Sequence, residues 1–159
     1  MKKKNVSNEL KVLGQRLGHG RNLSKRLYTA PELIRLTGMS RKQVEYWAKI
    51  KLLKPKVQKS TAKIGQAAYF YSALDVVKAL IICELRQNHF SLRQVQVVAR
   101  NLEEHGLRLE APDMYLLTDG YSVYYANNKD EVIDTLKHNR QRLMLIPIQE
   151  QIRKLIKVA

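Results

Sequence analysis

The sequence predicts a mainly α-helical protein, with four helices and a β-hairpin followed by a small α+β module. Three observations lead to this prediction. Apolar residues recur at helical spacing in four segments between residues 30 and 105. Residues 56–71 lack that spacing and end in Tyr69-Phe70-Tyr71, which favours a strand. After Gly106, strand-like and helix-like segments alternate.

The first two predicted helices are short and close together. We expect Thr29 to cap a helix over residues 30–36, and Gly38 to end that helix in a left-handed conformation. Ser40 is expected to cap a second helix, from residue 41 to about residue 50. Two short helices joined by a tight turn are typical of a helix-turn-helix.

The second helix is expected to have one buried and one exposed face. Val44, Trp47 and Ile50 recur at intervals of three, so they should pack in the core. Trp47 is then a core anchor rather than a base-stacking residue. The polar and basic side chains left to face outward are Arg41, Lys42, Gln43 and Tyr46.

The remaining elements of this part are a hairpin and two longer helices. Residues 56–71 are expected to form two strands, with a basic tip that carries Lys56, Lys59 and Lys63. Ser72 is expected to cap a helix over residues 73–87, and Ser91 a helix over residues 92–105. Residues 27–106 are therefore predicted to form one domain.

Residues 107–159 predict a small mixed module of order ββαβα. Thr118-Asp119-Gly120 is a strong turn signal between its first two strands. The expected elements are strands at 114–117 and 121–125, a helix at 129–138, a strand at 143–146 and a helix at 148–158. A module of this size is too small to be stable alone, so we expect it to pack on the first domain or to pair with a second copy. Its apolar strands, around Leu116, Val123 and Leu145, favour a role in dimerisation.

The charge of the chain is unevenly distributed. Lys and Arg number 29 against 14 Asp and Glu, a net charge of +15. The first 63 residues hold 17 basic and three acidic side chains, and the rest carries only +1. Such a segregated excess indicates a polyanionic partner, above all nucleic acid. The polar, basic residues 1–26 are expected to form a flexible arm that adds phosphate or minor-groove contacts.

Several classes of protein are not expected from this sequence. It has no apolar run of about 18 residues, which predicts no membrane span. The basic N-terminus lacks a following apolar segment, which predicts a cytoplasmic protein. Cys83 is the single cysteine and is expected to be a small buried hydrophobe. The four histidines lack ligand spacing and no nucleophile–base–acid set stands out, so we expect no metal, no cofactor and no enzyme.

The segment from Tyr28 to about Glu104 carries a long ordered pattern. Its parts are Tyr28-Thr29-Ala30-Pro31-Glu32-Leu33, Leu36-Thr37-Gly38-Met39-Ser40-Arg41, Tyr46-Trp47 with Leu52-Leu53-Lys54-Pro55, Tyr71-Ser72 with Asp75-Val76, and His89-Phe90-Ser91-Leu92 with Val95. In order and spacing this pattern resembles the MerR family of winged helix-turn-helix DNA-binding proteins. Glu45 departs from it, since the family usually has Arg there, and His89 stands where the family has Gly. No long dimerisation helix follows Gly106.

The resemblance implies a sequence-specific transcriptional regulator that binds double-stranded DNA as a homodimer, with RNA polymerase at a promoter as a further partner. The helix that begins at Arg41 would enter the major groove, and the hairpin would contact the flanking backbone. The expected DNA contacts are Arg41, Lys42, Gln43, Tyr46, Lys49, Lys56, Lys59, Lys63, Tyr28 and Thr29. Dimerisation is expected to involve the chain from Gly106 onward, and the protein to lie on the nucleoid in the cytoplasm.

Two other functions fit the same winged fold. A DNA-architectural or excisionase-like recombination factor bends DNA without controlling transcription. A protein-interaction module, such as a chaperone modulator, would need no basic half. Selection of bound sites from random DNA separates the first from a regulator, because a single palindromic motif near a promoter favours regulation and loose or clustered sites favour architecture.

Overall fold

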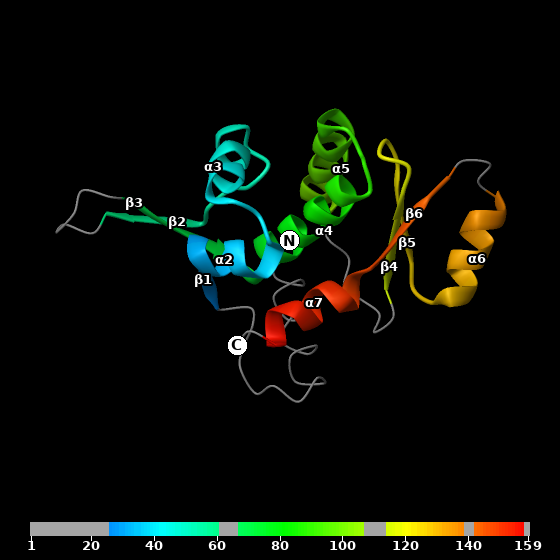
Figure 1. The fold of residues 1–159 in the computed structure, drawn as a ribbon. Helices are drawn as coiled ribbons and strands as arrows, with labels where there is room; N and C mark the ends of the chain where they lie inside the picture. The colour runs from blue at the N-terminus through cyan, green and yellow to red at the C-terminus, as the bar shows by residue number, and fades with distance from the viewer. Residues whose placement is uncertain (1–25, 61–66, 107–113, 139–141, 158–159) are drawn as a thin grey trace.

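The computed structural model describes residues 26–60, 67–106, 114–138 and 142–157, and the predicted arm, apart from Arg26, lies outside them. These residues form six helices and two three-stranded sheets, which confirms the mainly helical prediction (Figure 1). The first elements are β1 (Leu27–Thr29), α2 (Ala30–Thr37), α3 (Arg41–Lys49), β2 (Val57–Ser60), β3 (Ala67–Ser72), α4 (Ala73–Gln87) and α5 (Leu92–His105). The module contains β4 (Tyr115–Thr118), β5 (Val123–Ala126), α6 (Lys129–His138), β6 (Met144–Pro147) and α7 (Ile148–Lys157), in the predicted order.

The first four helices begin with reciprocal capping hydrogen bonds. In each, the hydroxyl of the capping residue accepts from the backbone N–H three residues later, and the side chain at that later position accepts from the backbone N–H of the cap. The pairs are Thr29 with Glu32, Ser40 with Gln43, Ser72 with Asp75, and Ser91 with Gln94. The four predicted caps are thus confirmed, as is the left-handed Gly38 at the end of α2, with a φ of 73°.

The first sheet has the order β1–β3–β2, and both of its strand pairs are antiparallel. Tyr28 lies opposite Tyr71, so β1 ties the start of the helix-turn-helix to the hairpin. The predicted hairpin consists of β2 and β3, which extend away from the helices on the left of Figure 1. The backbone N–H of Lys56 donates to Phe70 O at 2.7 Å, which anchors the beginning of the hairpin to β3.

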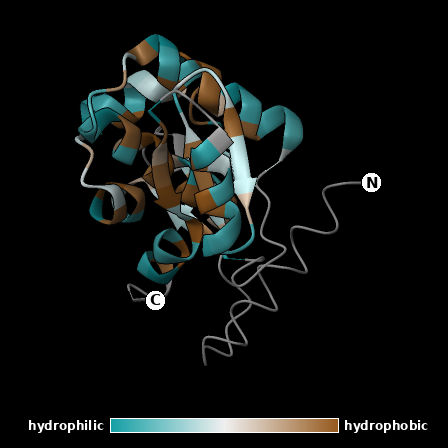
Figure 2. Cartoon of the chain, turned by 90° about the vertical axis from the view of Figure 1, so that its right-hand side faces the viewer, coloured by the Kyte–Doolittle hydropathy of each residue, from teal (hydrophilic) through white to brown (hydrophobic). Residues whose placement is uncertain are grey.

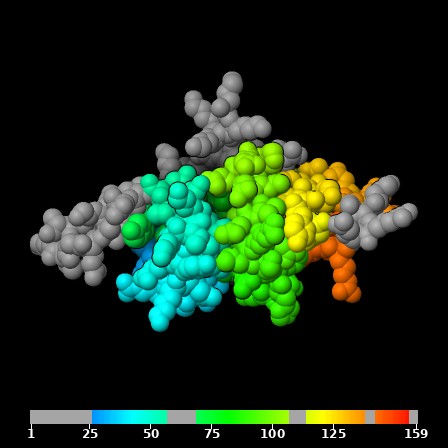
Figure 3. Space-filling view, turned by 90° about the horizontal axis from the view of Figure 1, so that it is seen from above, coloured from blue at the N-terminus to red at the C-terminus, as the bar shows by residue number. Residues whose placement is uncertain are grey.

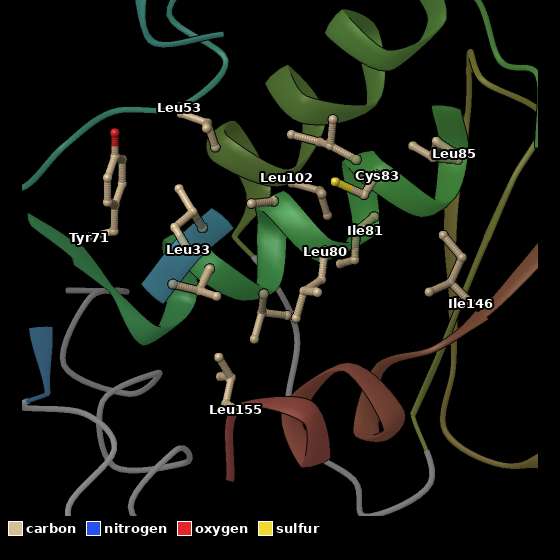
Figure 4. Close-up of a cluster of buried hydrophobic side chains, with 14 of the residues drawn as sticks. Leu33, Leu53, Tyr71, Leu80, Ile81, Cys83, Leu85, Leu102, Ile146 and Leu155 are labelled. Atoms are coloured by element: carbon tan, nitrogen blue, oxygen red, sulfur yellow. The ribbon is translucent and has the colours of Figure 1, made fainter. Parts of the chain in front are cut away.

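The core is centred on α4. Val44 and Trp47 of α3 are buried as predicted, and they belong to the same core as Leu33 of α2. Figure 4 shows side chains from α2, β3, α5, β6 and α7 around the helix that carries Leu80 and Cys83. Cys83 is buried as expected, and its burial raises the pKa of the thiol to about 11.

The second sheet has the order β5–β4–β6, and one of its faces joins this core. Leu116 and Ile146 are fully buried there, together with Ile152 and Leu155 of α7. The module was expected either to pack on the first domain or to pair with a second copy. These buried residues pack it on the first domain. Leu116 therefore belongs to the shared core. It is not available for the dimerisation that its apolar strand had indicated. Figure 2 shows hydrophobic residues gathered between the elements.

The turn between β4 and β5 lies against the start of α5. Gln94 Nε2 donates to Asp119 O at 3.3 Å, and a Cβ added to Gly120 would approach the Gln94 side chain to 2.7 Å. Gly120 also has a φ of 92°, so this turn requires glycine for both reasons. Seen from above, the turn lies directly beside α5 (Figure 3). The module thus contacts the first domain at α5 as well as at α4.

Candidate nucleic-acid interface

The outward face of α3 carries the side chains that the sequence assigns to it. The helix is held by the Ser40 cap at its start and by the buried Val44 and Trp47 beneath it. In the view of Figure 3, α3 and α5 lie side by side on one face of the molecule. The exposed residues of α3 are Arg41, Lys42, Gln43, Glu45, Tyr46 and Lys49.

Three of these exposed residues form one stripe along the helix. Lys42, Tyr46 and Lys49 are spaced four and three residues apart, which places them on the same side of an α-helix. Their side chains make no hydrogen bond or ion pair with other residues that the structure describes. Two ammonium groups and a phenol hydroxyl are therefore ready to contact phosphates and base edges.

Arg41 and Gln43 already have partners within the protein. Arg41 Nε lies 2.9 Å from Glu45 Oε1, and both side chains are exposed. An exposed pair of this kind contributes only about 0.5 kcal/mol, so a DNA phosphate can replace the carboxylate. Gln43 Oε1 accepts from the backbone N–H of Ser40 at 2.8 Å, and the side chain is thus used to start the helix.

The structure corrects the expectation for Tyr28. Its side chain is only 1% exposed, because the alternation of β1 points the ring toward the core. Burial raises the pKa of its hydroxyl, and the guanidinium of Arg26 lies 4.8 Å from the ring centroid. A DNA contact from the Tyr28 side chain is therefore wrong. Thr29 uses its hydroxyl to cap α2, where it accepts from the backbone N–H of Glu32.

The lysines of the predicted wing differ in what the structure shows of them. Lys56 is exposed at the base of the hairpin. Lys59 lies in β2, opposite Ala68. Lys63 lies outside the described residues, so its DNA contact remains a prediction. The basic surface at the base of the hairpin thus begins with Lys56.

Sequence reasoning missed three lysines, two between α3 and the wing and one on α4. Lys51 is exposed directly after α3. The ammonium of Lys54 contacts the carboxylate of Glu103 on α5, and this hydrogen bond holds the pKa of Glu103 below its usual range. Lys78 of α4 is partly buried nearby, and burial lowers the pKa of its ammonium. Charge was the only signal in the sequence, and it does not distinguish these lysines from others.

A polar cleft of about 320 Å³ lies between α2, α4 and α7. Gln151 is buried in it, donates to the carboxylate of Glu84 and accepts from the ammonium of Lys154. These bonds connect α4 to α7 and satisfy the buried amide. Among the described residues, no group of His, Cys, Asp and Glu is arranged to hold a metal ion.

The capped helix pair on α4, with a β-hairpin beside it, defines a winged helix-turn-helix protein. Residues 28–102 match the family model described as MerR HTH family regulatory protein. It is the family that the sequence pattern resembles.

Three relatives are each named an uncharacterized HTH-type transcriptional regulator, one from Mycobacterium bovis and two from strains of Mycobacterium tuberculosis. Each is 26% identical to the chain over 110 residues, which is 69% of this chain and 48% of the relative. The chain thus spans about half the length of the curated relatives it matches. In the described part of the chain, no helix is long and apolar enough to cross a membrane.

Proposed function

We propose that this protein is a sequence-specific regulator of transcription that binds double-stranded DNA as a homodimer. The observation that carries the proposal is the stripe of Lys42, Tyr46 and Lys49 on the exposed face of α3. In a helix-turn-helix the second helix lies in the major groove, and α3 is that helix here. The basic excess of the first 63 residues supplies the electrostatic attraction to DNA.

The side chains of α3 divide into two roles in this proposal. Arg41 lies in the first turn, from which residues of such helices reach base edges, and it exchanges Glu45 for DNA on binding. Lys42 and Lys49 neutralise phosphates, and the Tyr46 hydroxyl adds a phosphate contact. The Gln43 side chain stays bonded to the backbone of Ser40. Gln43 therefore contributes to DNA binding by fixing the protein backbone at the start of α3.

The wing and the arm add backbone contacts on either side of the groove. Lys56, Lys59 and Lys63 grip flanking phosphates, and residues 1–26 reach phosphates or the minor groove beyond them. Such contacts hold the protein in register without reading sequence. Thr29 caps α2, and in this way it helps to position the helix-turn-helix on the DNA backbone.

A homodimer would present two copies of α3 to successive major grooves. Their half-sites would lie about 34 Å apart along the duplex, which requires a pseudo-palindromic site. At a promoter, the bound dimer acts on RNA polymerase, and the protein resides on the nucleoid in the cytoplasm. The relatives' names support regulation, and nothing on the described surface favours catalysis.

Immunoprecipitation of the bound genomic DNA tests the proposal. We expect discrete peaks upstream of genes whose transcripts change when the protein is removed. Lys42→Glu should abolish these peaks, whereas Arg153→Glu, on the exposed face of α7, makes the same charge change away from α3 and should keep them. Peaks that survive Lys42→Glu, or broad occupancy without transcript changes, would contradict regulation through α3, and the second result would favour an architectural role.

A further inference from the structure

Helix α6 stands at the end of the molecule away from the hairpin (Figure 1). It packs on the second sheet through Val132, which shares a small core with Leu117 and Ala126. This core is separate from the one around α4. One side of α6 is thus held by the sheet, and its other side faces away from the protein.

The apolar surface around α6 is only half covered. Leu117 is fully buried, but its neighbours across the sheet, Tyr124 and Leu145, are 36% and 40% exposed. On α6 itself, Ile133 and Leu136 are 48% and 44% exposed. Grouped exposed apolar side chains of this kind mark interaction surfaces rather than ordinary scatter. We call these four residues the α6 patch.

The charges on α6 indicate what covers the patch. Asp130, Ile133 and Lys137 are spaced three and four residues apart, so an apolar residue lies between an acid and a base on one stripe. When two such helices pack antiparallel about a two-fold axis, Asp130 of each faces Lys137 of the other. The stripe is therefore complementary to itself, which a second copy of this chain satisfies twice.

The charge of the whole chain favours the same partner and the same place. The first 63 residues carry +14 and the rest carries +1, so contact through the module keeps the two basic regions apart. A helix of ten residues is about 15 Å long, which is short for an interface of about 800 Å² per partner. Tyr124 and Leu145 of the sheet must therefore contribute as well.

We propose that α6 packs antiparallel on α6 of a second copy, with Tyr124 and Leu145 completing the interface. This inference rests on the proposed function for its dimer and names the surface that forms it. The interface leaves α3 and the hairpin of each copy exposed, since neither belongs to the α6 patch.

Sedimentation of the full chain with charge-reversed variants tests the interface. Asp130→Lys and Lys137→Asp should each raise the dimer dissociation constant at least about tenfold, because each places like charges opposite one another twice. An equimolar mixture of the two variants should dimerise again, since every facing pair is then opposite in sign. Glu150→Lys on α7 is the control and should sediment as the wild type does. Circular dichroism checks that each variant is folded.

Wild-type protein that is monomeric at tens of micromolar would overturn the inference. Single variants that dimerise like the wild type, or a mixture that stays monomeric, would overturn it too. DNA binding separates this result from the proposed function. A wild type that dimerises through α6 and has no sequence preference on DNA contradicts the function alone, and a sequence-specific protein that dimerises unaffected by these variants contradicts the interface alone.

Discussion

At α3, the pairing of Arg41 with Glu45 sets how much positive charge the helix presents. The sequence shows Glu45 where the family usually has Arg, but only the structure shows that its carboxylate faces Arg41, 2.9 Å away. The carboxylate both holds Arg41 and repels phosphate. If α3 faces DNA as proposed, this carboxylate holds the affinity for DNA below what the helix could reach.

Replacing Glu45 should therefore strengthen DNA binding. We expect Glu45→Gln to bind random-sequence duplex at least about twofold more tightly at low salt, because the exposed pair contributes about 0.2–0.5 kcal/mol and one repulsive charge is removed. Glu150→Gln, on α7, is the matched control and should leave affinity unchanged. Fluorescence anisotropy measures both, and equal or weaker binding by Glu45→Gln would show that Glu45 does not face the DNA.

Strained backbone is also a property of single residues here. His89 and Lys51 have φ values of 66° and 62°, in the left-handed region that favours glycine. His89 follows α4 at the position where the MerR pattern has Gly. Having histidine there instead of glycine therefore costs backbone strain. His89→Gly should stabilise the protein by about 0.5–1 kcal/mol in urea unfolding. His89→Ala keeps a Cβ in that conformation, and an equal gain from it would refute the explanation.

At the scale of elements, the starts of helices could be predicted and their packing could not. A capping box lies within four residues of sequence, so Thr29, Ser40, Ser72 and Ser91 were identifiable without a fold. The spacing that buries Trp47 was likewise local. The contact of Gln94 with the β4–β5 turn joins residues 25 positions apart, and no periodicity signals it.

The same limit explains the wrong prediction for the start of the helix-turn-helix. Tyr28 has a polar hydroxyl next to an expected DNA-binding element, and which way it points depends on its pairing with Tyr71. The outward position of Arg41, Lys42, Gln43 and Tyr46 was predicted, since it follows from which residues the helix buries. Which of these side chains are free, and which are held by Glu45 or by the Ser40 cap, could be seen only in the structure.

The first cap of the helix-turn-helix should make stability depend on pH. The backbone N–H of Thr29 donates to the Glu32 carboxylate, and this holds the pKa of Glu32 below its usual value of 4.5. A carboxyl with a lowered folded pKa stabilises the protein above its unfolded pKa, and that stabilisation is lost as pH falls through the folded value.

We therefore expect Glu32→Gln to cost about 1 kcal/mol at pH 7 and much less near pH 3. Urea unfolding of the wild type and the variant at both pH values measures the difference. A cost that is the same at pH 7 and pH 3 would mean that the charge of Glu32 does not stabilise the cap.

At the scale of the whole molecule, the helix-turn-helix and the module share one core. Ile152 and Leu155 of α7 are buried with the residues of α4 that support α3. Cooperative unfolding of both parts follows from this packing, because neither can lose its half of the core alone. The small size of the module predicted that its stability depends on the first domain. In the structure, the buried face of α7 makes this contact.

Trp47 offers a direct measure of this coupling, because it is the single tryptophan and lies in α3. Ile152→Ala leaves a cavity in α7 and should destabilise the protein by about 2–4 kcal/mol. Unfolding followed by Trp47 fluorescence should report that full loss, although the substitution is in the module. Arg153→Ala, at an exposed position of the same helix, should change it little. An unchanged Trp47 transition in Ile152→Ala would mean that the two parts unfold independently.

Sequence-specific recognition of duplex DNA by α3 can be measured by having the full chain select bound sites from a random-sequence duplex pool. We expect enrichment of one motif with two-fold symmetry, whose half-sites are centred about 10 base pairs or a multiple of that apart. Repeated rounds that leave the pool without an enriched motif would contradict it.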